Sequence, residues 1–283
     1  METQGNTFVV GIDFWGPSTN ALATAVKFAQ MLDANVIALH VKENNSHSHY
    51  PETMDIDRNE PEEDLEIELE KLVDPFRKTG VKIESMLLIG NVTFNLLEVC
   101  EENSVDLIFM GIREGRLLED IFIGENTMHL VRNEDYPLVV VDLPPEETPL
   151  QEMMIPFDRK VGIEGVLQFL KGLKQPMTRK ALMITSLTPD ESEAEVLAAV
   201  NKAADQVIET GIRDIEIEIV KDADARDAVI TQVLADRGMF DLVLLEHIDY
   251  SEAGRMTAGS LIEEIVTKCR MPVLCLPKTK TAE

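Results

Sequence analysis

The sequence predicts an α/β protein made of two tandem domains, each with a doubly wound parallel sheet. Two observations predict this fold. Residues 105–110 are repeated by residues 240–245, and 136–141 are repeated by 271–276 at the same offset. Within each copy, short apolar runs alternate with segments of helical periodicity. Two domain-sized copies indicate a tandem pair rather than a solenoid.

The first copy has a β-α-β-α-β-α-β-α-β order. Apolar runs predict strands at residues 8–12, 36–41, 82–89, 107–111 and 137–142. Apolar side chains at helical spacing predict helices at 22–29, 65–76, 94–102 and 121–131. Ser18 is a candidate N-cap for the first helix, and Gly80 is expected to end the second.

The second copy repeats the order with strands at 153–157, 181–187, 215–220, 242–245 and 273–276. Its helices are expected at 166–173, 194–210, 229–234 and 261–268. Apolar strands that each precede a helix indicate a parallel sheet covered on both faces. A Pro-rich polar linker at 144–149 divides the chain into domains 1–147 and 148–283.

Composition excludes several classes of function. The net charge of -26 argues against nucleic acid and anionic membranes as partners. No apolar run has the length of a membrane span, and the first residues lack a basic signal region, so a cytoplasmic location is expected. Cys100, Cys269 and Cys275 show no metal-site spacing, which predicts buried free thiols.

Ligands of doubly wound sheets bind outside the carboxyl ends of the strands, so the loops that follow the strands are the candidate site. Glycines there allow positive φ and close approach, and helix N-terminal amides attract phosphate. Gly90 follows one predicted strand, Gly111 ends the next, and Gly124 lies near the start of a predicted helix.

At these loops the chain resembles a tandem universal stress protein of the UspA-like superfamily. The resemblance lies in Asp13 and Asp158 after the first strand of each copy, in residues 39–41, in 106–111 and in 137–141. It implies Rossmann-like domains of the adenine nucleotide alpha hydrolase type. ATP-binding members of the family carry G-x2-G-x9-G-S/T, so the resemblance implies ATP, ADP or AMP as the ligand.

By this resemblance, Asp13 and Val41 would contact adenine, and the glycine loop would hold ribose and phosphate. Gly111 and Gly124 keep the family's total separation, but Gly115 is displaced by one position. Glu125 replaces the final hydroxyl, and its charge is expected to weaken phosphate binding unless an Arg offsets it. The predicted binding residues of this copy are Asp13, Val41, Gly90, Gly111, Arg113, Gly115, Gly124, Glu125, Asn126 and Thr127.

The second copy departs from the motif differently. It keeps Asp158 and the Gly259-Ser260 pair, but Glu246 stands at the first glycine position. Its second strand ends in residues 184–187, without the His-Val pair of the first copy. An adenine nucleotide is therefore expected to prefer the first copy. The alternative is that both sites are relics, whose glycines serve turns.

The remaining candidate metal-binding and catalytic residues have weaker support. His47 and His49 are spaced as metal ligands can be, but a polar loop is the simpler interpretation, so no metal site is expected. His40 is expected to be structural. Asp13 and Asp158 could act as bases, yet no Ser-His or Cys-His constellation stands beside them, so no catalytic residue is assigned.

The sequence predicts a stress-response or regulatory protein in which ligand binding shifts the population of loop arrangements. The alternatives are a slow ATP-hydrolysing enzyme, with Asp13 and Glu125 as its acids, and a ligand-free scaffold. The last strand of each copy is expected to pair in an internal pseudo-dimer that buries Val139, Val140, Leu274 and Cys275. A homodimer and an unidentified protein partner are further expectations.

Overall fold

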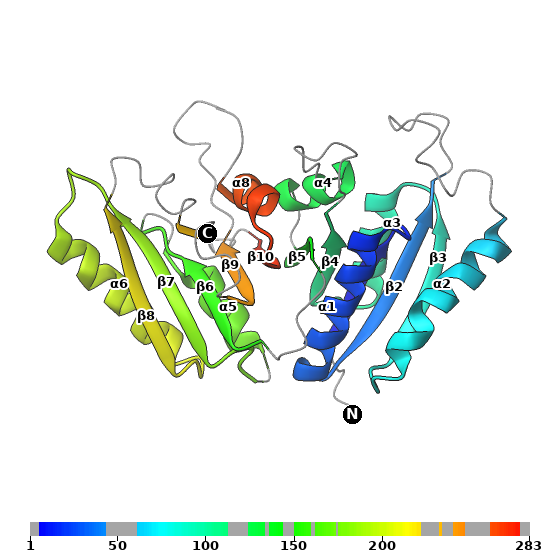
Figure 1. Cartoon of the computed structure of the whole chain (residues 1–283), viewed down its shortest axis with the longest axis horizontal. Coiled ribbons are helices and arrows are strands. Elements are labelled where there is room, and N and C mark those ends of the chain that lie inside the picture. Colours follow the sequence, from blue (N-terminus) through cyan, green and yellow to red (C-terminus); the bar gives the residue numbers. More distant parts are fainter. Residues whose placement is uncertain are drawn as a thin grey trace. The chain divides into compact units, whose positions relative to one another are not determined.

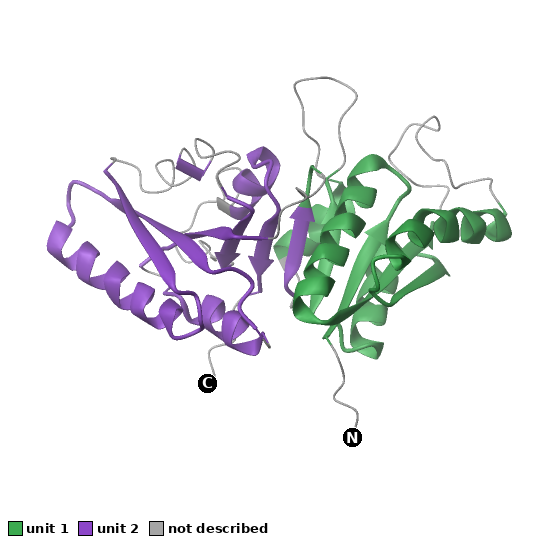
Figure 2. Cartoon of the chain, turned by 60° about the horizontal axis from the view of Figure 1, so that its bottom comes forward, with its two compact units in different colours: residues 1–133, 141–145 green, residues 134–140, 146–283 purple. Residues whose placement is uncertain are grey.

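The computed structural model has two compact units, coloured separately in Figure 2. Unit 1 holds residues 1–133 and 141–145, and unit 2 holds 134–140 and 146–283. The structure describes residues 6–43, 61–112, 124–133, 136–143, 150–159, 162–173, 175–221, 232–233, 240–246 and 261–277. Residues 134–140, from the first sequence copy, thus cluster with unit 2.

Unit 1 is a parallel α/β unit, labelled in Figure 1. Its strands are β1 (Asn6–Ile12), β2 (Ala34–Lys42), β3 (Ile83–Ile89) and β4 (Leu107–Gly111). Its helices are α1 (Gly16–Leu32), α2 (Glu62–Arg77), α3 (Val92–Glu102) and α4 (Glu125–Asn133). The strands are parallel in the order β3-β2-β1-β4, so the order in which the chain adds strands to the sheet reverses between β1 and β4.

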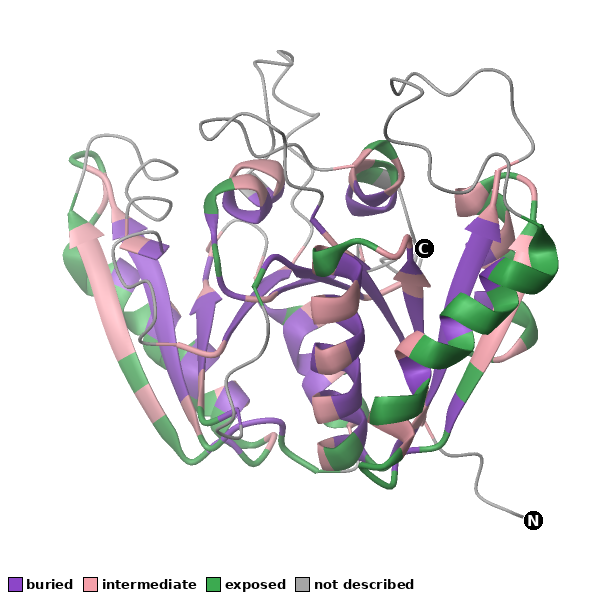
Figure 3. Ribbon diagram, turned by 45° about the vertical axis from the view of Figure 1, so that its right-hand side comes forward, coloured by how far each residue is buried: buried purple, intermediate pink, exposed green. Residues whose placement is uncertain are grey.

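The helices of unit 1 cover the sheet in two pairs. α1 contacts α2, and α3 contacts α4. Crossovers between parallel strands are right-handed, and strands are added on one side of β1 up to β3 and on the other side from β4. The pair α1 and α2 therefore covers one face of the sheet, and the pair α3 and α4 covers the other. Between them β1, β2 and β4 are apolar and largely buried, whereas β3 at the end of the strand order is more exposed, as the ribbon of Figure 3 shows. Because helices cover both faces of the sheet, polar side chains can gather at the carboxyl ends of its strands.

Unit 2 repeats this strand order. Its strands are β6 (Glu152–Pro156), β7 (Lys180–Leu187), β8 (Asp214–Lys221), β9 (Leu242–Glu246) and β10 (Val273–Leu276). Its helices include α5 (Glu164–Gly172), α6 (Glu193–Ile208) and α8 (Leu261–Lys268). The parallel order β10-β9-β6-β7-β8 puts its own reversal between β6 and β9.

The strand β5 (Leu138–Val141) adds an antiparallel member to the sheet of unit 2. Val139 is the register partner of Leu274, and Val140 that of Val273. All four side chains are buried, as is Cys275. Apolar side chains on both strands therefore make this pairing part of a packed core rather than an exposed edge.

The predicted fold class is confirmed: both units are α/β, with mostly parallel sheets. Each predicted strand has its counterpart, with boundaries that differ by one or two residues. The prediction of Ser18 as an N-cap is wrong. The helix begins at Gly16 with Trp15 at the N-cap, because Pro17 suits the first turn. Most of the predicted helix at 229–234 lies outside the described residues.

The three cysteines are free and buried, as predicted. Burial raises the pKa of the Cys275 thiol to about 12, so this thiol stays protonated and unreactive at neutral pH. Within the described ranges, no helix combines the length and the apolar character that a membrane crossing requires.

Candidate functional site

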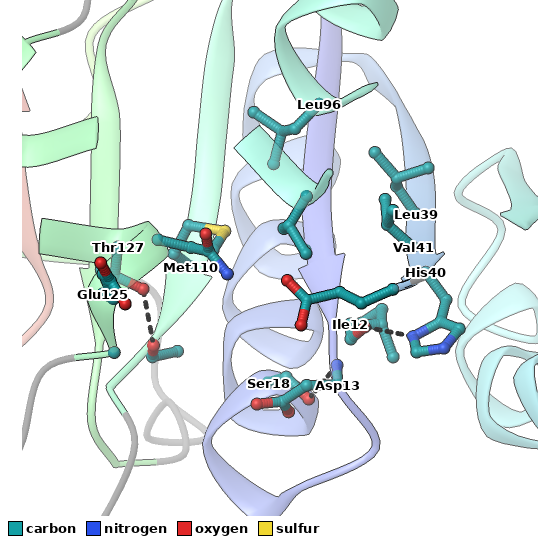
Figure 4. A pocket seen from close by; sticks show the side chains of 16 residues that line it. Ile12, Asp13, Ser18, Leu39, His40, Val41, Leu96, Met110, Glu125 and Thr127 are labelled. Carbon is teal, nitrogen blue, oxygen red and sulfur yellow. Dashed lines mark hydrogen bonds between the residues drawn. The ribbon is translucent and has the colours of Figure 1, made fainter. Parts of the chain in front are cut away.

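Unit 1 contains a cavity at the carboxyl ends of β1, β2 and β4, shown in Figure 4. Its volume is about 140 Å³. Asp13 follows β1, Val41 is the residue before the last of β2, and Gly111 ends β4, and all three line it. Residues 124–127, at the start of α4, complete the wall. The topology thus brings together most of the predicted binding residues of the first copy, at the reversal point between β1 and β4.

The turn after β1 is held by short polar contacts. The Asp13 carboxylate accepts a hydrogen bond from the Trp15 backbone N–H at 3.0 Å, and the Asp13 N–H donates to Ser18 Oγ at 3.2 Å. Ser18 Oγ in turn donates to the Trp15 carbonyl at 2.9 Å. Asp13 therefore fixes the start of α1 while it lines the cavity, and Ser18 acts by supporting this turn.

Phe14 takes a left-handed backbone conformation in the same turn, with φ of 61°. Its ring centroid lies 4.5 Å from that of His40. A bulky residue rarely adopts this conformation, and such residues gather at functional sites. His40 is buried, and its Nδ1 lies 2.7 Å from the Ile12 carbonyl oxygen. The ring thus ties β2 to the end of β1, and His40 also lines the cavity.

Glycine is present at this edge for a different physical reason at each position. A Cβ at Gly111 would lie 2.5 Å from the Pro17 carbonyl carbon, so glycine lets α1 approach β4. Gly90 does not line the cavity. Its φ of 138° is a conformation that favours glycine, and this accounts for glycine at the position. A Cβ at Gly124 would meet only Thr127 Oγ1, at 3.9 Å. The described protein atoms therefore leave room for a side chain at Gly124.

Several lining residues were missed by the sequence analysis. Glu43, which follows β2, adds a carboxylate to the cavity wall. Leu39, Leu96 and Met110 add apolar wall. Position could have revealed Glu43, because it lies in a loop at the carboxyl end of a strand. The apolar residues gave no such signal, since they look like any other core residue.

Other predicted residues lie outside the described part of the chain. These are Arg113, Gly115, Gly259 and Ser260, together with His47 and His49. Among the residues that the structure does describe, no group of His, Cys, Asp and Glu side chains is arranged to hold a metal ion.

The corresponding edge of unit 2 is crossed by the chain's own side chains. Arg159, which directly follows Asp158, donates to Thr185 Oγ1 at 2.8 Å and to the Ser186 carbonyl at 2.6 Å. Its other guanidinium nitrogen donates to Glu191 at 2.5 Å. By strand register, Thr185 and Ser186 stand where unit 1 has His40 and Val41. The Arg159 side chain therefore lies over the end of β7, which is the counterpart in unit 2 of the β2 end that lines the unit 1 cavity.

Glu191 anchors this network. It accepts hydrogen bonds from the Thr188 backbone N–H at 3.0 Å and hydroxyl at 2.9 Å. The Thr188 backbone N–H, the Arg159 guanidinium and the Thr188 hydroxyl lower the pKa of Glu191 to about 2. The carboxylate is thus ionised over the whole physiological range, and the charge pair persists.

Glu246 gives unit 2 its second difference. It takes the place that Gly111 has in unit 1, and its Oε1 accepts a hydrogen bond from the Gly165 N–H at 3.1 Å. Gly165 lies in the first turn of α5, where unsatisfied amides attract an anion. An internal carboxylate therefore sits at the start of the helix that follows the first strand of unit 2.

The fold and this edge define a doubly wound α/β protein with a ligand-sized cavity at a topological switch point. The model of the universal stress protein family matches residues 6–142. The universal stress protein MJ0531 of Methanocaldococcus jannaschii is 27% identical over 141 residues, which cover 49% of this chain and 83% of the relative. Residues 6–142 therefore form a domain of the universal stress protein family.

Solved structures extend the likeness of fold to both units. A universal stress protein from Archaeoglobus fulgidus has a TM-score of 0.71 at 14% identity, and the match covers 98% of this chain and all 100% of that one. A protein from Pseudomonas aeruginosa described as a putative universal stress protein has a TM-score of 0.58 at 13% identity, covering 96% of this chain and 93% of that one. At these identities the likeness concerns the fold alone.

Proposed function

We propose that this chain is a regulatory protein of the stress response whose unit 1 cavity binds the nucleoside part of an adenine nucleotide. The observation that carries the proposal is the single cavity that Asp13, Val41 and residues 124–127 line together. Its volume of about 140 Å³ is close to that of a cavity that holds one aromatic ring. The apolar wall suits the face of a base, and the polar loops suit a ribose.

Ligand binding would act by population shift. The cavity joins the loop after β1, the loop after β2 and the start of α4, so a bound ligand favours one arrangement of these three segments. A protein partner that contacts the same edge then distinguishes the bound from the free form. Unit 2 takes no part as a ligand site in this proposal, because Arg159 and Glu246 make internal hydrogen bonds at the ends of its strands.

The proposal includes an internal pseudo-dimer of domains 1–147 and 148–283. It is supported by the antiparallel pairing of β5 with β10, one strand from each sequence copy. A tandem chain supplies such a strand at high effective concentration, so the pairing needs no second molecule. A homodimer and a separate protein partner remain proposals that depend on other surfaces.

The test is a calorimetric titration of the full chain with adenosine, comparing wild type with Gly124→Val and Gly124→Ala. Valine adds two methyl groups beyond Cβ at a residue that lines the cavity, whereas a single Cβ finds room 3.9 Å from Thr127 Oγ1. We expect Gly124→Val to weaken adenosine binding by about tenfold or more, which is roughly 1.4 kcal/mol, and Gly124→Ala to change it much less. Equal affinities in all three proteins would show that this cavity is not the binding site.

A further inference from the structure

β3 is the outermost strand of unit 1, and one of its sides has no neighbouring strand among the described residues. It pairs with β2 along the other side, over the whole of Ile83–Ile89, and α2 packs against it (Figure 1). The unpaired side, here the open side of β3, presents backbone N–H and C=O groups with which another chain can pair.

The backbone of β3 directs its polar groups alternately toward β2 and toward the open side. The Val36 N–H of β2 donates to the Lys82 carbonyl, and the Gly90 N–H donates to the Lys42 carbonyl of β2, both at 2.9 Å. Even-numbered residues of β3 therefore face β2, because neighbouring residues of a strand face opposite sides. The open side receives the backbone groups of the odd-numbered residues Ile83, Ser85, Leu87 and Ile89.

Arg77 covers the first carbonyl group on the open side. It is the last residue of α2, the helix that precedes β3. Its Nε donates to the Ile83 carbonyl at 3.1 Å, and its Nη2 donates to Ser85 Oγ at 3.4 Å. The guanidinium therefore lies where the N–H of an added strand would have to donate.

Glu70 holds the guanidinium in this position. Its two carboxylate oxygens accept hydrogen bonds from Nη1 and Nη2 of Arg77, and the Ser85 hydroxyl donates to the same carboxylate. Arg77 and the Ser85 hydroxyl lower the pKa of Glu70 to about 2, so the carboxylate stays ionised throughout the physiological pH range. Two parallel hydrogen bonds also fix the orientation of the guanidinium.

The Arg77–Glu70 pair matters more for strand addition than for stability. The two side chains are 32% and 51% exposed, and exposed ion pairs add little to the free energy of unfolding. A strand that pairs with Ile83, however, must first displace the guanidinium and break its hydrogen bonds to Glu70.

The outermost strand of unit 2 carries its own charges instead. β8 stands last in the strand order and alternates charged with apolar residues, so that Asp214, Glu216 and Glu218 share one face. Charged side chains along an edge strand oppose pairing with another chain. β3 contains a single charged residue, Glu84, so its protection depends on Arg77 from the preceding helix.

We infer that Arg77 guards the open side of β3 against antiparallel pairing with β3 of a second copy of this chain. A second copy is the natural occupant, because a two-fold contact lets two identical strands satisfy each other. In pairing centred on Met86, the Ile89 N–H of one copy meets the Ile83 carbonyl of the other, which is the group that Arg77 occupies. The inference goes beyond the proposed function and does not depend on the cavity.

Sedimentation velocity of the full chain over a range of protein concentrations tests the inference. We expect Arg77→Ala to lower the concentration at which half of the chain is dimeric by roughly tenfold or more, because each dimer gains one hydrogen bond per copy. Glu70→Gln releases the guanidinium without removing it and should give a smaller shift in the same direction. Lys71→Ala is the matched control, because it removes one positive charge from an exposed position of α2 and should behave as wild type.

Ile89→Pro distinguishes strand pairing from association of misfolded chains. It removes an N–H that faces the open side and leaves the hydrogen bonds to β2 in place, and proline is tolerated at such positions of edge strands. Added to Arg77→Ala, it should restore the association of wild type; added to wild type, it should change nothing. The inference is overturned if Arg77→Ala and Glu70→Gln sediment as wild type does, if Ile89→Pro fails to reverse their association, or if Ile89→Pro alone dissociates a wild-type dimer.

Discussion

The two units share one strand order but differ in the side chains at the carboxyl ends of their strands. In unit 1, Gly111 lets α1 approach, and a cavity remains between Asp13 and the start of α4. In unit 2, Glu246 replaces this glycine and Arg159 spans the end of β7. One edge thus keeps a cavity, whereas charged side chains of the chain itself cross the other.

The comparison shows what a degenerate motif means physically. Buried backbone and side-chain polar groups at either edge need hydrogen-bond partners, because such groups are satisfied in native proteins. Unit 2 meets this need with charged side chains whose hydrogen bonds are among the stronger kind. The Arg159–Glu191 pair therefore lies in unit 2 at the strand end whose equivalent in unit 1 lines the cavity.

The largest expected effect comes from closing the approach that Gly111 permits. Gly111→Ala places a Cβ 2.5 Å from the backbone of Pro17, so α1 or β4 must shift. We expect a loss of about 1–3 kcal/mol in the free energy of unfolding, measured by urea denaturation. Gly124→Ala is the control and should stay within roughly 0.5 kcal/mol. Equal stability of the two variants would contradict the assigned role of Gly111.

A smaller effect is expected at the edge of unit 2. Arg159→Ala removes hydrogen bonds to Thr185, Ser186 and Glu191, and the Arg159 side chain is 19% exposed. We expect it to lower the free energy of unfolding by about 1–2 kcal/mol. Lys221→Ala breaks the pair with Glu193, in which both side chains are more than 60% exposed, and should change stability by less than about 1 kcal/mol. If Arg159→Ala lowers the free energy of unfolding no more than Lys221→Ala does, the hydrogen bonds of Arg159 contribute no more than an exposed ion pair.

Much of the fold could be predicted from the sequence, because apolar runs report burial and the repeat reports the number of domains. The positions of Asp13, Val41 and residues 124–127 in one cavity also followed, since parallel topology brings the carboxyl ends of strands to one edge. The prediction of Ser18 as an N-cap failed because Pro17 moves the start of α1.

The polar networks could not be predicted. Arg159 meets Thr185 and Glu191 through side-chain geometry between segments distant in sequence, and no local pattern marks such a pair. Glu43 was overlooked for the same reason, because an acidic residue in a loop most often only faces solvent. Residue type indicated which loops mattered, but only the folded arrangement showed which loop residues line the cavity.

Hydrogen exchange of the full chain with and without saturating adenosine tests the central claim most directly, because it follows both edges in one experiment. We expect ligand-dependent protection in residues 11–13, 39–43 and 124–128, around the unit 1 cavity, and unchanged exchange at 157–159 and 184–188 of unit 2. Protection confined to the unit 2 segments, or equal at both edges, would contradict the account.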